Sequence, residues 1–267
     1  MTKEGILEVI LHLYMRSPNS KLILGIDIGG TGIKGAPVNI ETGTLAKERF
    51  RIETPHPAKP DDVASVVQQI AKHFHYSGPT GITFPAIVKN GVIYSASNVD
   101  KSWINIDASK LFQTYLGAPV TVVNDADAAG IAEMRFGAGV GRHGVVILLT
   151  FGTGIGSAIF CDGVLLPNTE FGHLKIRGKD AELRASERIR EKKHMSFKKW
   201  ADIVSEYLEE LEKLFSPELF LIGGGISKKA DKFLPNLRAR TTVPIEAAKM
   251  QNDAGIIGAA TLAKIRS

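Results

Sequence analysis

The chain has 267 residues, of which 44% are hydrophobic, 23% charged and 7% aromatic, the composition of an ordinary globular protein with a full core. Its only cysteine, Cys161, excludes a disulfide framework and a cysteine-based metal site, and predicts a protein of the reducing cytoplasm. The net charge of +5 is concentrated in residues 175–199, where ten basic residues face four acids, so this segment is either a solvated helix face or an electrostatic track for a polyanion.

Residues 1–21 are predicted to form an N-terminal arm. Apolar side chains at positions 6, 9, 10 and 13 share one helical face, which favours a short docking helix or a frayed segment. Glu8 and His12 interrupt the apolar run, which argues against a signal peptide, and the run is too short to span a bilayer. No later stretch approaches a membrane span, so no membrane partner is expected.

The first half of the chain after this arm predicts a mixed α/β lobe. The segment 54–60 contains three prolines and cannot be helical, and Asp61 or Asp62 would cap the helix that follows it. The expected strands are 22–28, 33–39, about 44–52, 81–84 and 119–123; the expected helices are 61–75, 106–115 and 126–136; a hairpin turns at 89–91.

The second half opens in the same way and predicts a second α/β lobe. Strands are expected at 144–151, 154–160, 219–222 and near 242–245, and helices at 180–193, 197–214, shortly after Gly225, and at 254–265. This order predicts two similar lobes with mixed sheets. We expect residues 22–123 to form a small lobe on which the C-terminal helix 254–267 packs, and residues 124–253 to form a larger one.

A glycine-threonine turn occurs once in each half. Gly30-Thr31-Gly32-Ile33 recurs as Gly152-Thr153-Gly154-Ile155, each time between two apolar segments that are predicted to be strands. Such a turn presents backbone N–H groups and a hydroxyl to phosphate oxygens. The pair predicts two lobes that face one polyphosphorylated ligand across a cleft, whereas a single turn would indicate only a tight hairpin. No Walker-A sequence occurs, which excludes the P-loop class.

Residues 223–225, three glycines, lie at a strand end that opens a helix. Either a nucleotide or phosphate approaches the backbone there, or the glycines make a tight strand-to-helix turn.

Two polar pairs are candidates for chemistry. Asn124-Asp125 directly follows a strand, where an aspartate can take the proton of a substrate hydroxyl during phosphoryl transfer; the alternative is that Asp125 or Asp127 only caps the helix. Glu170 and His173 could hold two hydroxyls of one sugar ring, although a histidine in a loop is more often a surface residue.

Asn98 and the segment 100–103 supply further polar groups beside a tryptophan. The ordinary explanation for that segment is a buried tryptophan whose neighbours are capped.

These motifs together resemble the ROK family of sugar kinases, which implies the actin/hexokinase-like (ribonuclease H-like) fold. The resemblance covers about residues 22–265. It rests on D-I-G-G-T at 27–31, G-T-G at 152–154 and G-G-G-I at 223–226. Five further stretches are similar to the branch of the family that uses polyphosphate: T-F-P-A at 83–86, S-A-S-N-V-D-K-S-W at 95–103, N-D-A-D-A-A-G at 124–130, N-T-E-F-G-H-L at 168–174 and F-S-P-E-L-F-L-I-G-G-G-I-S at 215–227.

One departure separates this chain from most members of the family. They carry a cysteine cluster for zinc shortly after the G-H dipeptide, whereas Gly172-His173 is followed here by L-K-I-R-G-K-D-A-E. A structural zinc site is therefore not expected. The resemblance places Glu182 at the position of the sugar-binding glutamate that follows the cluster, and the departure favours the polyphosphate-using branch.

The resemblance also implies a role for each matching residue. Asp125 corresponds to the catalytic base, and Asp27 to the acid near magnesium, which it would hold through water. The implied sugar ligands are Asn98, Asn124, Asp125, Glu170, His173 and Glu182. The implied donor-binding residues are Asp27, Gly29, Gly30, Thr31, Gly32, Lys34, Gly152, Thr153, Gly154, Gly223, Gly224 and Gly225.

We therefore expect Mg²⁺-dependent transfer of a phosphoryl group from inorganic polyphosphate, with ATP as a further candidate donor, to the 6-hydroxyl of glucose, with mannose as a further candidate acceptor. The alternative is a hexose or N-acylhexosamine kinase that uses ATP only. A ROK-type repressor is not expected, because 21 residues ahead of the first strand cannot hold a helix-turn-helix, and so no nucleic-acid partner is expected. A homodimer is common among similar proteins, but the sequence holds no decisive interface signal.

Overall fold

The computed structural model describes residues 21–96 and 99–266, so the expected helix at 5–15 and the candidate Asn98 lie outside the described residues. The chain divides into two compact units. The first runs to Ala128 and resumes at Gly255, and the second is Ala129–Ala254. The boundary therefore falls inside a helix, slightly later than the expected one at 123/124. Within the described residues no helix is both long and apolar enough to cross a membrane.

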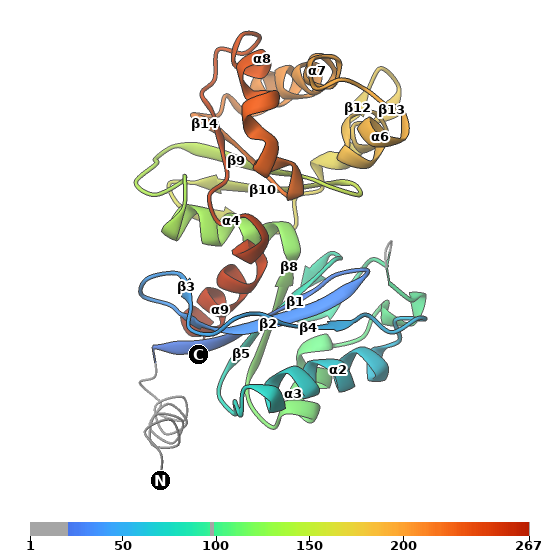
Figure 1. Cartoon of the computed structure of the whole chain (residues 1–267), viewed down its shortest axis with the longest axis vertical. Coiled ribbons are helices and arrows are strands. Elements are labelled where there is room, and N and C mark those ends of the chain that lie inside the picture. The colour runs from blue at the N-terminus through green and yellow to red at the C-terminus, as the bar shows by residue number, and fades with distance from the viewer. Residues whose placement is uncertain (1–20, 97–98, 267) are drawn as a thin grey trace. The chain divides into compact units, whose positions relative to one another are not determined.

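The first unit contains a mixed sheet whose order is β3-β2-β1-β5-β8, with β4 also paired to β2 (Figure 1). The antiparallel pairs are β1–β2, β2–β3 and β2–β4, and the parallel pairs are β1–β5 and β5–β8. Its strands are β1 (Leu22–Ile28), β2 (Gly32–Asn39), β3 (Thr44–Leu45), β4 (Phe50–Glu53), β5 (Thr80–Phe84) and β8 (Val120–Asn124).

The strand expected over 44–52 is broken into β3 and β4, so that prediction was wrong. Pairing with β2 stops after Leu45 opposite Val38 and resumes at Phe50 opposite Gly35. The Pro37 carbonyl accepts a hydrogen bond from the Ala46 N–H (2.8 Å), but proline has no N–H to donate to the partner strand in exchange. A proline at a ladder position interrupts pairing, and the partner strand bulges there.

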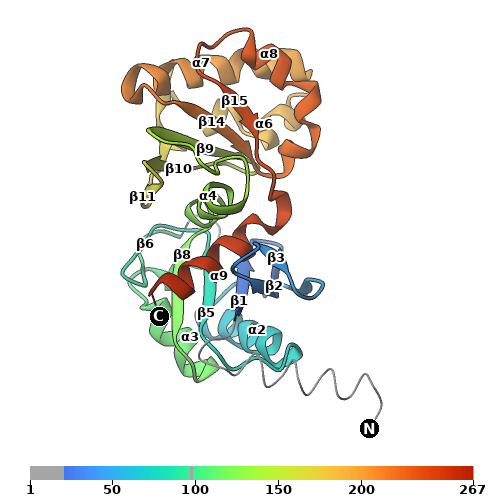
Figure 2. The same ribbon diagram turned by 90° about the vertical axis from the view of Figure 1, so that its left-hand side faces the viewer.

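Helices cover both faces of this sheet: α2 and α3 lie on one face and α9 on the other (Figures 1 and 2). The expected aspartate cap of α2 was wrong. Lys59 occupies the N-cap with no side-chain hydrogen bond, Pro60 begins the helix, and Asp61 and Asp62 lie in its first turn, where carboxylates stabilise the helix dipole. The remaining elements of this unit are α2 (Pro60–His73), β6 (Val88–Lys89), β7 (Val92–Ile93), η1 (Lys101–Trp103), α3 (Ala108–Leu116) and α9 (Ala254–Arg266).

Helix α9 approaches the rest of the first unit backbone to backbone. A Cβ atom added at Gly25 or Gly81 would overlap with the carbonyl of Ile256 or Ala259 on α9. On α9 itself, a Cβ at Gly258 would overlap with the carbonyl of Ala128. Ala128 belongs to the first turn of the helix that begins at Asp125, so this close approach fixes the helix that carries a candidate base.

Replacing Gly258 by alanine is therefore expected to lower the free energy of unfolding by about 1–3 kcal/mol, because α9 must move away from Ala128. The expected sign is the reverse of the usual one, since alanine in a helix interior is about 0.8–1.0 kcal/mol more favourable than glycine. Denaturant unfolding of the variant and the wild type measures the difference. A stability equal to or above that of the wild type would contradict this packing.

The second unit contains a mixed sheet of order β11-β10-β9-β14-β15 (Figure 2). Helices α7 and α8 cover one face, where Phe151 packs against Trp200, and residues 129–136 of α4 cover the other. Its strands are β9 (Val145–Phe151), β10 (Ile155–Cys161), β11 (Val164–Leu166), β14 (Leu219–Gly223) and β15 (Ile245–Ala247). The helices and the hairpin are residues 129–136 of α4 (Asp125–Phe136), η2 (Phe171–His173), β12 (Lys175–Ile176), β13 (Lys179–Asp180), α5 (Glu182–Ala185), α6 (Glu187–Lys192), α7 (Phe197–Phe215), η3 (Gly225–Lys232), α8 (Leu234–Arg238) and η4 (Gln251–Asp253).

The single helix expected over 180–193 is two short helices, α5 and α6. Ser186 between them is buried and extended (φ −61°, ψ 155°). The Trp200 indole N–H donates to the Ala185 carbonyl (2.7 Å). In a continuous helix that carbonyl would instead accept from a backbone N–H of the next turn. Two further predictions were displaced: β15 begins at Ile245 rather than near 242, and the helix after Gly225 is a 3₁₀ segment kinked at Lys229.

Candidate active site

Asp27 lies at the carboxyl end of β1 and is held by its neighbours on both sides. Lys34 of β2 and Thr83 of β5 are its partners in the sheet register. The Thr83 hydroxyl donates to one carboxylate oxygen (2.6 Å), and the Lys34 ammonium lies 3.0 Å from the other. The neighbouring strands therefore orient the Asp27 carboxylate and partly compensate its negative charge.

The first glycine-threonine turn, residues 29–32, is braced by its own backbone and by two side chains. The Gly29 N–H donates to the Gly32 carbonyl (3.1 Å). The Thr54 hydroxyl donates to the Gly29 carbonyl (2.6 Å), and the Arg51 guanidinium donates to the Thr31 carbonyl (2.6 Å). Sequence reasoning missed both side chains, because nothing in the sequence reveals that β4 pairs with the first residues of β2.

The second turn, residues 152–154, shares the Gly-Thr-Gly sequence of the first turn but is one residue shorter. The flanking residues Phe151 and Ile155 pair across three residues, whereas Ile28 and Ile33 pair across four. The Gly152 N–H donates to the Gly154 carbonyl (3.1 Å).

Helices α5 and α6 hold this second turn. The Arg188 N–H at the start of α6 donates to the Gly152 carbonyl (3.1 Å), and the Ile155 N–H donates to the Glu182 carboxylate of α5 (3.4 Å). A Cβ at Gly154 would overlap with that carboxylate, so this glycine makes room for Glu182.

Gly30 and Gly152 are glycines that the fold does not require. Neither lies at positive φ, and a Cβ atom added at either one would meet no atom within 4 Å. Neither backbone conformation nor packing therefore explains the missing side chains. Open space above a turn of N–H groups is what close approach of an anionic ligand needs.

The three glycines after β14 differ from one another. Gly224 has φ +80°, and a Cβ there would lie 2.6 Å from the Phe151 carbonyl oxygen, so the fold requires glycine at this position. Cβ atoms at Gly223 and Gly225 would make only ordinary contacts. The tight-turn alternative thus accounts for Gly224. Gly223 is buried, and a Cβ there would pack against Thr150, Leu148 and Ala248, so only Gly225 leaves space over its backbone.

Asn124, rather than Asp125 or Asp127, provides the N-terminal cap of α4. Its buried side-chain oxygen accepts from the N–H groups of Ala126 (2.8 Å) and Asp127 (3.1 Å), and its amide donates to the Ala86 carbonyl (3.1 Å). Asp125 is exposed at the first residue of the helix, with one carboxylate oxygen 2.8 Å from the Ala126 nitrogen. Capping is therefore assigned to Asn124, and the exposed carboxylate of Asp125 lies at the carboxyl end of β8, where ligands collect in α/β sheets.

Glu170 in the second unit interacts electrostatically with the other two candidate sugar ligands of that unit. Burial raises the pKa of the Glu170 carboxyl; the charge of His173 opposes this shift, and the charge of Glu182 adds to it. The three side chains thus form one cluster.

Ser157 of β10 fixes the loop that carries Glu170. Its hydroxyl donates to the Thr169 carbonyl (2.7 Å) and accepts from the Phe171 N–H (3.0 Å), while the Thr169 hydroxyl donates to the Ser157 carbonyl (3.0 Å). Sequence reasoning missed this network, since serine and threonine in a strand and a loop carry no local signal of a partner.

His173 is oriented by a carboxylate that the sequence did not single out. Its Nδ1 lies 3.2 Å from Asp180 on β13, and Lys175 on β12 also pairs with Asp180. These two partners hold the pKa of the Asp180 carboxyl below its usual value. A carboxylate at Nδ1 selects the tautomer with hydrogen on Nδ1, which leaves Nε2 as an acceptor for a hydroxyl.

The hairpin β12–β13 follows Gly172-His173, at the chain position where most members of the family carry the cysteine cluster. Arg177 and Gly178 have positive φ (50° and 76°), as the two central residues of a tight hairpin turn require. Within the described residues there is no group of three or more His, Cys, Asp or Glu side chains that could hold a metal ion.

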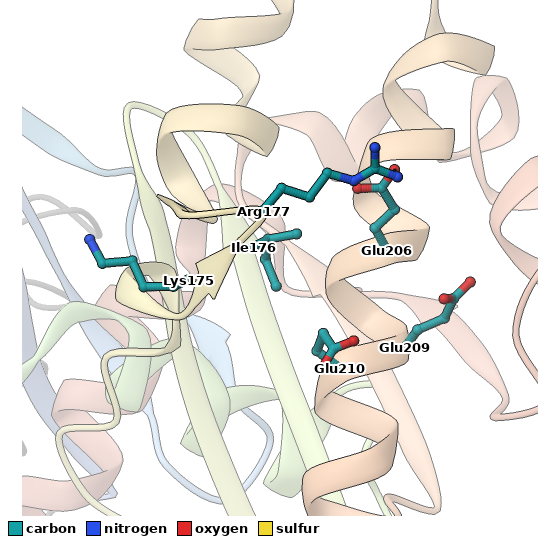
Figure 3. Close-up of a pocket in the computed structure, with 6 residues that line it drawn as sticks. All are labelled: Lys175, Ile176, Arg177, Glu206, Glu209 and Glu210. Carbon is teal, nitrogen blue, oxygen red and sulfur yellow. The ribbon is translucent and has the colours of Figure 1, made fainter.

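A pocket beside this hairpin is lined by charges of both signs. Figure 3 shows Arg177 directed at Glu206, with Glu209 and Glu210 further along α7. Three carboxylates against Lys175 and Arg177 make the lining unsuitable for a polyanion.

The fold and these turns define a class of proteins: residues 23–187 match the model of the ROK family, and the chain belongs to that family. It is 50% identical over 237 residues to the polyphosphate glucokinase of Mycobacterium tuberculosis, covering 88% of this chain and 89% of that protein. The solved structure of the inorganic polyphosphate/ATP-glucomannokinase from Arthrobacter sp. strain KM matches with a TM-score of 0.87 and 49% identity, over 92% of this chain and 99% of that chain. A ROK glucokinase from Streptomyces griseus, solved with glucose and AMPPNP, matches with a TM-score of 0.77 and 26% identity, over 91% and 99%.

Proposed function

We propose that this protein is a polyphosphate-dependent glucokinase, which transfers the terminal phosphoryl group of inorganic polyphosphate to the 6-hydroxyl of glucose. ATP is a second donor and mannose a second acceptor in this proposal. The observation that carries it is the exposed Asp125 carboxylate at the end of β8, with capping assigned to Asn124. The polyphosphate and glucose named for relatives at about 50% identity support the choice of substrates.

In this mechanism the carboxylate of Asp125 accepts the proton of the sugar 6-hydroxyl. The 6-oxygen then forms a bond to the terminal phosphorus, and the bond from that phosphorus to the next bridging oxygen breaks, leaving the donor one unit shorter. Backbone N–H groups of the two turns, with Thr31, Thr153 and Lys34, bind the phosphate oxygens on which negative charge is distributed. Gly225 leaves room for the rest of the donor.

Asp27 fits a magnesium ion held through water rather than directly. Its two carboxylate oxygens already have protein partners, Thr83 and Lys34, and this disfavours direct coordination of the metal ion by Asp27. Mg²⁺ keeps several waters and binds largely through substrate phosphates, where it would offset their charge. In this proposal Asp27 would hold the ion through water molecules.

The sugar is recognised by side chains that pair with its hydroxyls. We assign this role to Asn98, Asn124, Glu170, His173 and Glu182, together with Asp125. Neutral hydroxyls lose water on binding, and only well-placed donors and acceptors offset that loss, which explains the density of amide, carboxylate and imidazole groups.

The raised pKa of Glu170 predicts a pH dependence of sugar binding. A carboxylate accepts hydrogen bonds from hydroxyls, and protonation removes part of that capacity, so glucose affinity is expected to fall as the pH decreases through the raised pKa. The fall should begin at a higher pH than an ordinary glutamate would give. Calorimetric titration of glucose between about pH 5 and 7.5 measures it. The Glu170→Gln variant should bind more weakly and lose this dependence, and a variant that keeps the wild-type pH profile would refute the assignment.

The proposed function is tested by an initial-rate panel of glucose and mannose against long-chain polyphosphate and ATP. Saturable formation of glucose 6-phosphate from polyphosphate without added ATP is the expected result. Activity with ATP alone would establish the ATP-only hexose or N-acylhexosamine kinase instead. A homodimer and a cytoplasmic location stay predictions, for light scattering and cell fractionation to decide.

A further inference from the structure

The basic segment 175–199 is divided by the fold into two parts of different character. In the first part, Arg177 and Arg184 both pair with Glu206 (2.8 and 2.9 Å), and Lys175 pairs with Asp180. These cations are largely compensated by neighbouring carboxylates. The first part is thus a structural network and a poor surface for a polyanion.

The second part keeps its positive charge. Arg188, Lys192 and Lys193 on and after α6, and Lys198 and Lys199 at the start of α7, are exposed and form no ion pair with any described residue. Segment η3, far away in the sequence, adds the exposed Lys228 and Lys232, which likewise form no ion pair among the described residues. We call the seven residues the tail surface: Arg188, Lys192, Lys193, Lys198, Lys199, Lys228 and Lys232.

Contacts between side chains hold these three elements together. Arg190 of α6 and Lys232 of η3 both lie over the ring of Phe197 on α7, at 4.6 and 5.9 Å from its centroid. Lys229 of η3 lies 3.8 Å from Glu187 of α6. Elements α6, α7 and η3 therefore bring exposed cations to one part of the second unit, and such a distribution of positive charge attracts polyanions.

The tail surface begins at the second turn. The Arg188 N–H donates to the Gly152 carbonyl, so α6 starts within one residue of the proposed donor site. Arg188 and Lys192 stand four residues apart and share one face of α6, about 6 Å along the helix axis. Along α6, positive charge thus continues away from the turn.

From this continuity we infer that the tail surface binds the part of a polyphosphate chain that extends beyond the transferring phosphoryl group. The inference rests on the proposed function and adds to it the residues that distinguish a long polyanion from a compact donor. A flexible chain of phosphates displaces counterions along a row of lysines and arginines, so affinity should rise with chain length and fall with salt. On this inference, ATP and tripolyphosphate contact fewer of these cations than a long chain does.

The test uses two double variants, Lys192→Glu with Lys193→Glu and Lys228→Glu with Lys232→Glu. The KM for long-chain polyphosphate is expected to rise about ten-fold or more in each, because two attractive charges become repulsive. The slope of log KM against log salt should also decrease by roughly one for each cation removed. The KM values for tripolyphosphate and ATP should change less than two-fold, which shows that the variants are folded and that the turns are intact.

Lys179→Glu is the matched control, because Lys179 is exposed on β13 in the same basic segment but outside the tail surface. It should leave the KM for polyphosphate unchanged. An unchanged polyphosphate KM in both double variants, or an equal rise in the control, would overturn the inference. Loss of RNA binding with an unchanged polyphosphate KM would assign the surface to nucleic acid instead and also overturn it. A wild-type protein inactive with polyphosphate but active with ATP would end the donor assignment and the tail surface together, an outcome distinct from the others.

Discussion

The Asp125→Asn variant is expected to phosphorylate glucose about 10²–10⁴ times more slowly than the wild type, with most of the loss in kcat. Asparagine keeps the size and the hydrogen-bonding ability of the side chain but cannot accept the proton of the 6-hydroxyl. The fold should tolerate the change, because Asp125 is exposed and Asn124 caps α4. Steady-state rates and thermal unfolding of both proteins provide the comparison.

Asp62→Asn serves as a control for removing an aspartate from the first turn of a helix, since Asp62 occupies that position in α2. It should retain full activity. A loss of only a few-fold in Asp125→Asn would remove Asp125 from the role of base. A large loss accompanied by a lowered melting temperature would point to a structural role instead.

Gly30→Ala and Gly152→Ala are expected to separate stability from catalysis. A methyl group at either position enters open space, and the φ angle is compatible with alanine, so stability should be unchanged or raised by about 0.4–1 kcal/mol. In the proposed function, the same methyl group would stand where the donor phosphate approaches the backbone. A displacement of about 1 Å can cost 10²-fold in rate, and we expect a decrease in kcat/KM for the donor of that order.

Gly224→Ala provides the opposite control, because Gly224 has φ +80° and its Cβ would overlap with the backbone of Phe151. That variant should lose stability. Full activity in Gly30→Ala and Gly152→Ala would show that the space over the two turns is not used by a ligand.

Much of the fold followed from periodicity and turn chemistry. Helix α2, the hairpin at 89–91 and the strands around both glycine turns were predicted correctly, since each is specified by residues close in sequence. The errors have non-local causes. The break between β3 and β4 depends on Pro37 in the neighbouring strand, and the break between α5 and α6 depends on Trp200 of α7.

The candidate site divides in the same way. Asp27, Asp125 and both turns could be named as candidates because each motif is contiguous in the sequence. Asp180, Arg51 and Ser157 could not, because their importance lies in contacts across the fold: with His173, with the Thr31 carbonyl and with the loop at Thr169. The tail surface could be anticipated only in part. The sequence showed a basic run but neither its neutralised first part nor the lysines that η3 contributes.

A crystal structure with glucose bound would test the proposed chemistry most directly, through the distance between the Asp125 carboxylate and the 6-oxygen of the sugar. Our account predicts a hydrogen bond of about 2.6–3.2 Å, the reach that a general base needs. Glucose bound with its 6-hydroxyl on another side chain, and Asp125 directed away from it, would contradict the account.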